Sequence, residues 1–173
     1  GVFIHELTTL YQAFTQNQPS RLPELTIQYA DYAIWQRQWL DGEVLETQVS
    51  YWQKQLKNLC VLQLPTDYPR PKVQTFKGKR QQLVICESLT AALKRLSQQQ
   101  GVTLFMTLLA AFDVLLHWYT NEEDIVVGTD IANRNQAQTY PLIGFFVNQL
   151  VLRTNLSDNP TFIELLARVR QVT

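Results

Sequence analysis

Residues 141–153 read PLIGFFVNQLVLR, an apolar run with the alternation of a β-strand and one amide side chain on its apolar side. Strict alternation puts Asn148 on the same face as Phe146 and Leu150. A buried primary amide costs roughly 1–3 kcal/mol unless its polar atoms find partners. Asn148 is therefore predicted either to tie down a neighbouring loop carbonyl or bulge, or to line a site.

Apolar residues at helical spacing surround this run and predict six helical segments. They are 3–14, 27–40, 45–56, 89–99, 105–119 and a last one that opens at Asn159-Pro160. Gly101 is suited to end the fourth of these helices, and Thr103 is suited to cap the fifth. Short strands are expected over 82–86 and 125–127, in addition to the strand that holds Asn148.

The order of these elements predicts the fold class. Helices come first, a segment with three prolines between residues 65 and 71 follows, and strands mixed with helices complete the chain. This order is typical of α/β or α+β mixed layers, and some of the strands that the helices would cover are expected to lie outside the chain. The proline-rich segment is read as a crossover between two lobes.

The composition of the 173 residues limits the class of partner. Hydrophobic residues make up 46% and support a real core, whereas 17% charged residues is low and hints at surface that other sequence would bury. The chain has 15 basic and 15 acidic residues and no basic stripe, so nucleic acid is an unexpected partner. Without a signal peptide or membrane-length apolar run, the expected location is cytoplasmic, with no membrane partner.

Few residues offer catalytic or metal-binding chemistry by themselves. His5 and His117 are expected at the surface, with His117 paired to an exposed Asp113 one turn earlier. No serine stands in a nucleophile elbow, and the 6 glycines form no phosphate-binding loop. Cys60 and Cys86 lack metal-ligand spacing and are predicted to be buried or half-buried free thiols.

Four blocks of the sequence together resemble the condensation domains of nonribosomal peptide synthetases. Residues 143–148 (IGFFVN) are similar to the late signature of these domains, and residues 29–35 (YADYAIW) are similar to their Tyr-x-Asp-Phe/Tyr-Ala-x-Trp motif. Residues 64–71 and 128–134 fall where such domains have similar sequence segments. The blocks occur in the family's order, and the stretch from the first to the last, residues 29–148, spans most of the chain.

The resemblance implies an incomplete chloramphenicol-acetyltransferase-like fold of two lobes with the reaction at their junction. Residues 1–63 would supply the C-terminal helices of the first lobe, 64–80 the crossover, and 81–173 part of the second lobe. The implied reaction is amide formation between substrates tethered by 4'-phosphopantetheine to upstream and downstream peptidyl carrier proteins, beside an adenylation domain. The domain itself would need no metal or cofactor.

The family's His-His-x-x-x-Asp-Gly motif, which carries the catalytic histidine, does not occur in this sequence. In similar proteins it immediately precedes the helix that residues 1–4 resemble, so the chain is expected to be a central fragment without a catalytic residue and inactive alone. One alternative is a non-catalytic remnant that docks carriers. Another is an acyltransferase of the same fold that uses a free acyl donor.

The resemblance also nominates site residues. The candidates for lining the substrate tunnel are Asn148, Gly144, Gln149 and Arg134. The structural candidates are Tyr29, Asp31, Tyr32, Trp35 and Arg153. Arg134 could instead be an exposed loop charge, and the aromatic stripe of 29–35 could be core. The family commonly has Thr at position 149 and Pro at position 130, where this chain has Gln149 and Asp130, so substrate preference cannot be carried over.

Overall fold

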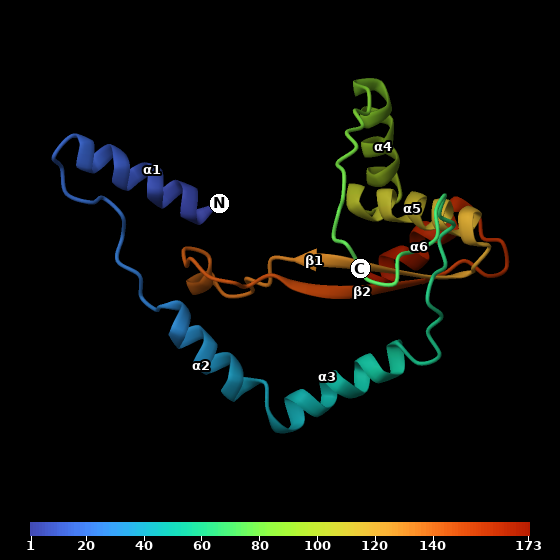
Figure 1. Cartoon of the computed structure of the whole chain (residues 1–173), viewed down its shortest axis with the longest axis horizontal. Helices are drawn as coiled ribbons and strands as arrows, with labels where there is room; N and C mark the ends of the chain where they lie inside the picture. The colour runs from blue at the N-terminus through green and yellow to red at the C-terminus, as the bar shows by residue number, and fades with distance from the viewer. The chain divides into compact units, whose positions relative to one another are not determined.

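The computed structural model describes all residues from 1 to 173, and these fall into two units that are each discontinuous in sequence. Residues 1–57 and 130–150 form the first unit, and residues 58–129 and 151–173 form the second. Figure 1 shows the order of the elements along the chain. The division into 1–63, 64–80 and 81–173 stays a prediction.

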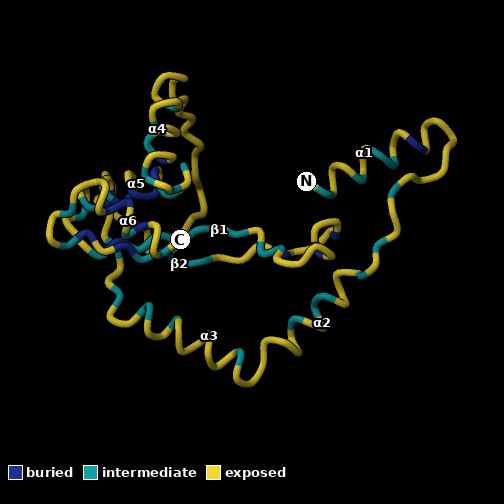
Figure 2. Tube along the Cα trace, turned by 180° about the vertical axis from the view of Figure 1, so that it is seen from behind, coloured by how far each residue is buried: buried dark blue, intermediate teal, exposed yellow.

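The first unit contains three helices: α1 (Val2–Thr15), α2 (Tyr29–Trp39) and α3 (Gly42–Gln55). Helix α2 begins where the Gln28 amide donates to the Asp31 carboxylate at 2.8 Å. Helix α3 begins where Oδ1 of Asp41 accepts from the Gly42 amide at 2.8 Å. Most of the residues in these helices are exposed, as the tube in Figure 2 shows.

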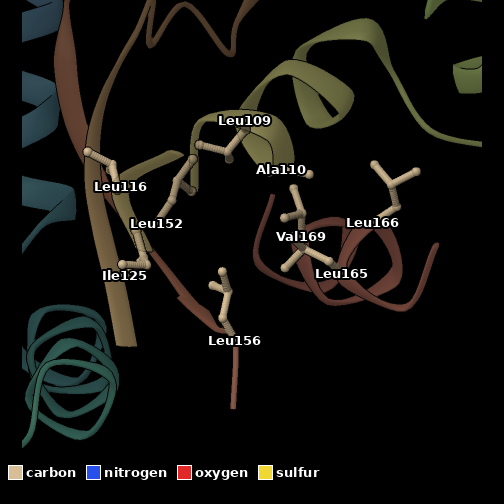
Figure 3. Close-up of a cluster of buried hydrophobic side chains, with 9 residues drawn as sticks. All are labelled: Leu109, Ala110, Leu116, Ile125, Leu152, Leu156, Leu165, Leu166 and Val169. Carbon is tan, nitrogen blue, oxygen red and sulfur yellow. The ribbon is translucent and has the colours of Figure 1, made fainter. Parts of the chain in front are cut away.

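The second unit contains α4 (Glu87–Gln99), α5 (Leu104–Thr120) and α6 (Phe162–Val172), and α5 and α6 contribute to a hydrophobic core together with residues of the strands. The core side chains shown in Figure 3 are Leu109, Ala110, Leu116, Ile125, Leu152, Leu156, Leu165, Leu166 and Val169. The predicted Thr103 cap is confirmed, because its hydroxyl accepts from the Met106 amide at 3.2 Å. Gly101 follows α4 with a φ of 63°, a left-handed conformation that suits glycine.

The sheet consists of two paired strands, β1 (Asp124–Ile131) and β2 (Asn148–Asn155). Leu152 and Thr154 of β2 are buried, and Arg153 between them is half-buried, as the alternation of a strand requires. Arg153 reaches Asp124 at the start of β1, with Nη2 2.7 Å from Oδ2. The strand pair therefore has an ion pair at this end.

One predicted strand is absent, and two predicted elements begin later than expected. Residues 82–86 form no strand, because no strand of the chain pairs with them. β2 starts at Asn148, and the preceding Phe145 carbonyl accepts from the Tyr29 hydroxyl instead of a neighbouring strand. The last helix starts at Phe162 after a Thr161 cap, which leaves Pro160 outside it.

The buried face of α5 also differs from the predicted one. Leu109 and Leu116 are buried as expected, but Phe105, Leu108, Phe112, Leu115 and Tyr119 are exposed. Asp113 lies on the buried face and is only 1% exposed, so the predicted surface pair with His117 does not form. Instead, Nδ1 of His117 hydrogen-bonds to the Glu122 carbonyl oxygen at 2.7 Å.

The two cysteines differ from expectation in their burial. Cys60 and Cys86 are free thiols, but both are exposed rather than buried, because most of the residues around each of them in the sequence are exposed too.

No single helix is long and apolar enough to cross a membrane. Only α4 and α5 taken together would have the necessary length and composition, and the chain bends by 104° between them.

Candidate functional site

The Tyr-x-Asp-Tyr-Ala-x-Trp block and the late signature meet in the first unit. The Tyr29 hydroxyl donates to the Phe145 carbonyl oxygen at 2.9 Å. The Tyr29 ring stands edge-on to Phe146, with centroids 5.2 Å apart and an angle of 87°, and the Tyr32 ring lies 4.7 Å from the same phenyl ring. Such aromatic pairs each contribute about 0.5–1.5 kcal/mol beyond their burial. Phe146 is buried at the centre of this cluster.

Gly144 allows this close approach. A Cβ atom at this position would lie 2.7 Å from Cε2 of Tyr29 and 2.9 Å from Cε2 of Phe146, both shorter than real Cβ contacts. The position therefore excludes any side chain as long as the two rings keep their places. Gly144 shapes the aromatic cluster and does not line the cavity that adjoins it.

Arg134 also contacts the cluster through the Phe146 ring. Its guanidinium carbon lies 4.1 Å from the centroid of the Phe146 ring, within range of a cation–π interaction. Its Nη1 also donates to the carbonyl oxygens of Thr139 and Tyr140. One half-buried side chain thus ties the loop after β1 to the segment that leads into β2.

A cavity of about 980 Å³ adjoins the cluster and lies entirely among residues of the first unit. Its lining residues from α2 and α3 and the loop after each are Tyr32, Trp35, Gln36, Trp39, Leu40, Leu45, Gln48, Val49, Trp52, Gln53 and Leu56. The others are Asn133, Asn135, Gln136, Thr139 and Asn148. We call this cavity the amide–indole cleft, because amide and tryptophan side chains predominate in its lining and none of the lining residues carries a charge.

Asn148 lines the amide–indole cleft but is exposed rather than buried in an apolar core. Its Oδ1 accepts from the Gln149 amide at 2.9 Å. The predicted energetic cost of a buried amide does not arise, because Asn148 is the first residue of β2 and remains open to solvent. Gln149 is exposed and does not line the cleft. Contact of either residue with a substrate stays a prediction.

The remaining structural candidates hold local elements in place. Asp31 caps α2, because its carboxylate accepts from the Gln28 amide at 2.8 Å. Trp35 stacks on Trp39 with centroids 5.7 Å apart and an angle of 13°. Arg153 belongs to the second unit and forms an ion pair with Asp124.

Two features of the molecule are not predicted by the sequence. Asn133 and Asn135 flank Arg134 and line the cleft, and the polar run in which they stand is the only signal for them. Asp113 is buried, and neither of its carboxylate oxygens forms a hydrogen bond. Burial raises the pKa of Asp113 to about 6, although the nearby Thr154 side chain offsets part of this effect. No group of three or more His, Cys, Asp or Glu side chains is placed to hold a metal ion.

Comparison with known proteins assigns the whole chain to one family. The family described as Condensation domain matches residues 1–173. A component of the linear gramicidin synthase of Brevibacillus parabrevis is 55% identical over 172 residues, which cover 99% of this chain and 3% of that protein. Malpinin synthetase of Mortierella alpina is 49% identical over 174 residues, which cover 100% of this chain and 2% of that protein.

Solved structures agree with this assignment. The X-domain from teicoplanin biosynthesis matches 99% of this chain with a TM-score of 0.89 and 30% identity, and the match covers 39% of that structure. The X-domain in its complex with OxyB matches with a TM-score of 0.88, with the same identity and coverages. The chain therefore spans well under half of the solved structures and a few per cent of the synthases.

Proposed function

The chain belongs to the condensation domain family, and on this basis we propose that it is part of a nonribosomal peptide synthetase condensation domain that joins carrier-tethered substrates by an amide bond. The substrates would be an aminoacyl or peptidyl thioester on an upstream carrier protein and an amine on a downstream carrier protein. Both would ride on 4'-phosphopantetheine arms of the carriers. An adenylation domain would be a further neighbour in the same polypeptide.

The reaction requires little covalent chemistry from the protein. The amine nitrogen attacks the thioester carbonyl carbon, a C–N bond forms, the C–S bond breaks, and the pantetheine thiol leaves as the amine loses a proton. Holding two tethered reactants at attack distance can supply several kcal/mol of the barrier reduction. Rigid walls around the reacting groups would therefore be the main contribution of this part of the domain.

The meeting of the two family blocks at Phe146 is the observation that carries the proposal. Tyr29 from residues 1–57 and Arg134 from residues 130–150 contact this ring or its neighbour, and Gly144 leaves room for the rings of Tyr29 and Phe146. Asn148 follows Phe146 by two residues and lines the cleft. In the complete domain we assign Asn148 the role of orienting a substrate through its amide, and we place Gly144, Gln149 and Arg134 beside the substrate tunnel.

The catalytic histidine motif is absent from residues 1–173, so these residues alone would not condense substrates. The test therefore uses the complete condensation domain that contains them. Amide formation is measured between two loaded carrier proteins with Asn148→Ala and with Gln98→Ala, a matched exposed amide on α4. We expect roughly a tenfold or greater loss for Asn148→Ala, equivalent to the cost of one lost hydrogen bond, and none for Gln98→Ala. Equal rates of amide formation for both variants would show that Asn148 does not orient the substrate.

A non-catalytic docking function is the second candidate. It is favoured by the similarity to the X-domain structure in complex with OxyB, at a TM-score of 0.88 and 30% identity. A docking module would bind a carrier protein or partner enzyme and form no amide. The two candidates are separated in the complete domain by measuring carrier binding and condensation together, since binding without any amide product supports docking alone.

A further inference from the structure

Positive charge is concentrated in one short segment of the second unit. Residues 70–80 hold five of the 15 basic residues of the chain and none of its 15 acidic ones. We call these residues the basic strap, and they belong to the segment between α3 and α4 that can be followed in Figure 1. The cations are Arg70, Lys72, Lys77, Lys79 and Arg80. The zero net charge of the whole chain conceals this local excess.

The basic strap is open to solvent along its whole length. Each of its residues is exposed, and none belongs to a helix or a strand. None of its five cations forms an ion pair or a side-chain hydrogen bond within the chain. Grouped cations without protein partners create a positive potential that attracts anions from solution. The strap therefore suits a negatively charged partner better than an internal structural role.

The spacing of the cations indicates what kind of anion fits. Lys77, Lys79 and Arg80 lie within four consecutive residues, which span at most about 14 Å. Three positive charges can therefore converge on one anionic group. Between them, a Cβ atom at Gly78 would meet nothing within 4 Å, so the space beside this cluster is open. Ammonium and guanidinium groups are the side-chain donors that bind phosphate oxygens most strongly.

We propose that residues 77–80 bind the phosphodiester of the 4'-phosphopantetheine arm on a carrier protein, and that the rest of the basic strap contacts the carrier surface around it. This inference rests on the proposed function, which makes two such carriers the partners of the complete domain. The arm is joined to its carrier through a phosphodiester, which bears a negative charge at neutral pH. The upstream and downstream carriers share this group, and binding measurements with each carrier separate them.

A carrier protein fits the basic strap better than a nucleic acid does. Outside the strap, acidic residues outnumber basic ones, so a long polyanion that extended beyond the strap would meet like charge. Apolar side chains also stand among the cations, since Val73 is 78% and Phe76 is 86% exposed. An apolar spot with charged residues around it is the layout of a protein–protein interface.

Reversal of two charges in the complete condensation domain tests the proposal. Lys77→Glu with Lys79→Glu changes the net charge by the same amount as Lys94→Glu with Arg95→Glu, at two exposed positions of α4. Dissociation constants are measured for each carrier protein with and without its arm. We expect the strap variant to weaken binding of an arm-bearing carrier roughly tenfold or more, and binding of the arm-free carrier about threefold or less. The α4 variant should change neither by more than about twofold.

Three outcomes would overturn the proposal. Equal losses of affinity in the strap variant and the α4 variant would reflect the net charge of the domain alone. Equal losses for carriers with and without the arm would exclude the phosphodiester as the recognised group. Strap-dependent binding of DNA, RNA or anionic vesicles, with carrier binding unchanged by the strap variant, would give the strap a different partner.

Condensation kinetics give a second measurement and separate this inference from the proposed function. The strap variant should raise KM for one carrier about tenfold and leave kcat within about twofold, because the strap binds the carrier and does not touch the reacting atoms. Amide formation with KM unchanged by the strap variant would contradict this inference alone. Strap-dependent binding of arm-bearing carriers without any amide product would contradict the proposed function alone.

Discussion

The hydroxyl group of Tyr29 donates a hydrogen bond to the carbonyl oxygen of Phe145, 116 positions further along the chain, at 2.9 Å. This bond uses a backbone oxygen that lies just before β2 and joins it to the first residue of α2. The contact fixes the segment that leads into Asn148. It therefore connects the stability of an aromatic cluster to the position of a candidate substrate-binding side chain.

Tyr29→Phe removes this bond and leaves the ring in place. We expect the free energy of unfolding of the complete domain to fall by about 1 kcal/mol, the usual net value of one hydrogen bond. Chemical denaturation measures the change. Tyr11→Phe in α1 is the matched control, because Tyr11 is exposed and lies outside the aromatic cluster around Phe146. An equal loss of unfolding free energy in both variants would show that the hydrogen bond from Tyr29 to Phe145 does not stabilise the domain.

Gly144→Ala introduces a methyl group where the rings of Tyr29 and Phe146 already lie. The rings must shift, and we expect a loss of roughly 1–3 kcal/mol in stability, the usual cost of overpacking. Gly128→Ala is the control, since a Cβ atom at Gly128 meets nothing within 4 Å. Thermal unfolding of the complete domain compares the two, and an unchanged Tm for Gly144→Ala would show that the rings move freely.

Arg134→Lys keeps the charge but removes the planar group that lies over Phe146. A lysine cannot reproduce both this stacking and the two carbonyl contacts, so we expect a loss of about 1 kcal/mol and a lower rate of condensation. Arg37→Lys, at an exposed position of α2, should change neither quantity. Stability and rate are measured on the same preparations. A full rate with Arg134→Lys would leave Arg134 without a role in positioning the loop.

We predict that Asp113 lowers the stability of the domain as the pH rises. Burial raises its pKa from 3.8 to about 6, so the folded state holds the proton over a range in which the unfolded state releases it. Its contribution to stability is therefore fully present below the unfolded pKa and is lost as pH rises from about 4 to about 6. The full difference corresponds to at most about 3 kcal/mol.

Asp113→Asn should abolish this dependence. At pH 7 the variant is expected to be more stable than the natural domain, because an uncharged amide replaces a buried carboxylate without a partner. Urea unfolding at pH 4.5 and pH 7 measures the effect, and Glu46→Gln at an exposed position of α3 is the control. The expected direction is contradicted if the natural domain is more stable at pH 7 than at pH 4.5 and Asp113→Asn removes that gain.

Local patterns are sufficient to predict the helices. The spacing of apolar residues, the Thr103 cap and Gly101 act within one or two turns, and all six helices occur close to their predicted positions. The strand predicted over 82–86 is wrong because strand formation depends on a partner far away in sequence. The buried face of α5 is partly wrong for the same reason, since the core around Leu109 is completed by α6 and the strands.

The candidate site can be predicted only in part. Resemblance to a family nominates Tyr29, Gly144 and Arg134, and the structure brings all three to Phe145 or Phe146. Neither periodicity nor spacing indicates that contact, because it joins segments that are distant in sequence. Asn133 and Asn135 escape prediction because polar loop residues carry no periodic signal.

The discontinuity of the two units has a consequence for recombination between condensation domains. The chain leaves the first unit after residue 57 and returns to it only at residue 130. A chimera joined between these points would combine α2 from one parent with the loop around Phe145 from the other. A compatible graft must therefore transfer residues 1–57 and 130–150 together, so a single junction inside this chain is expected to give mismatched hybrids.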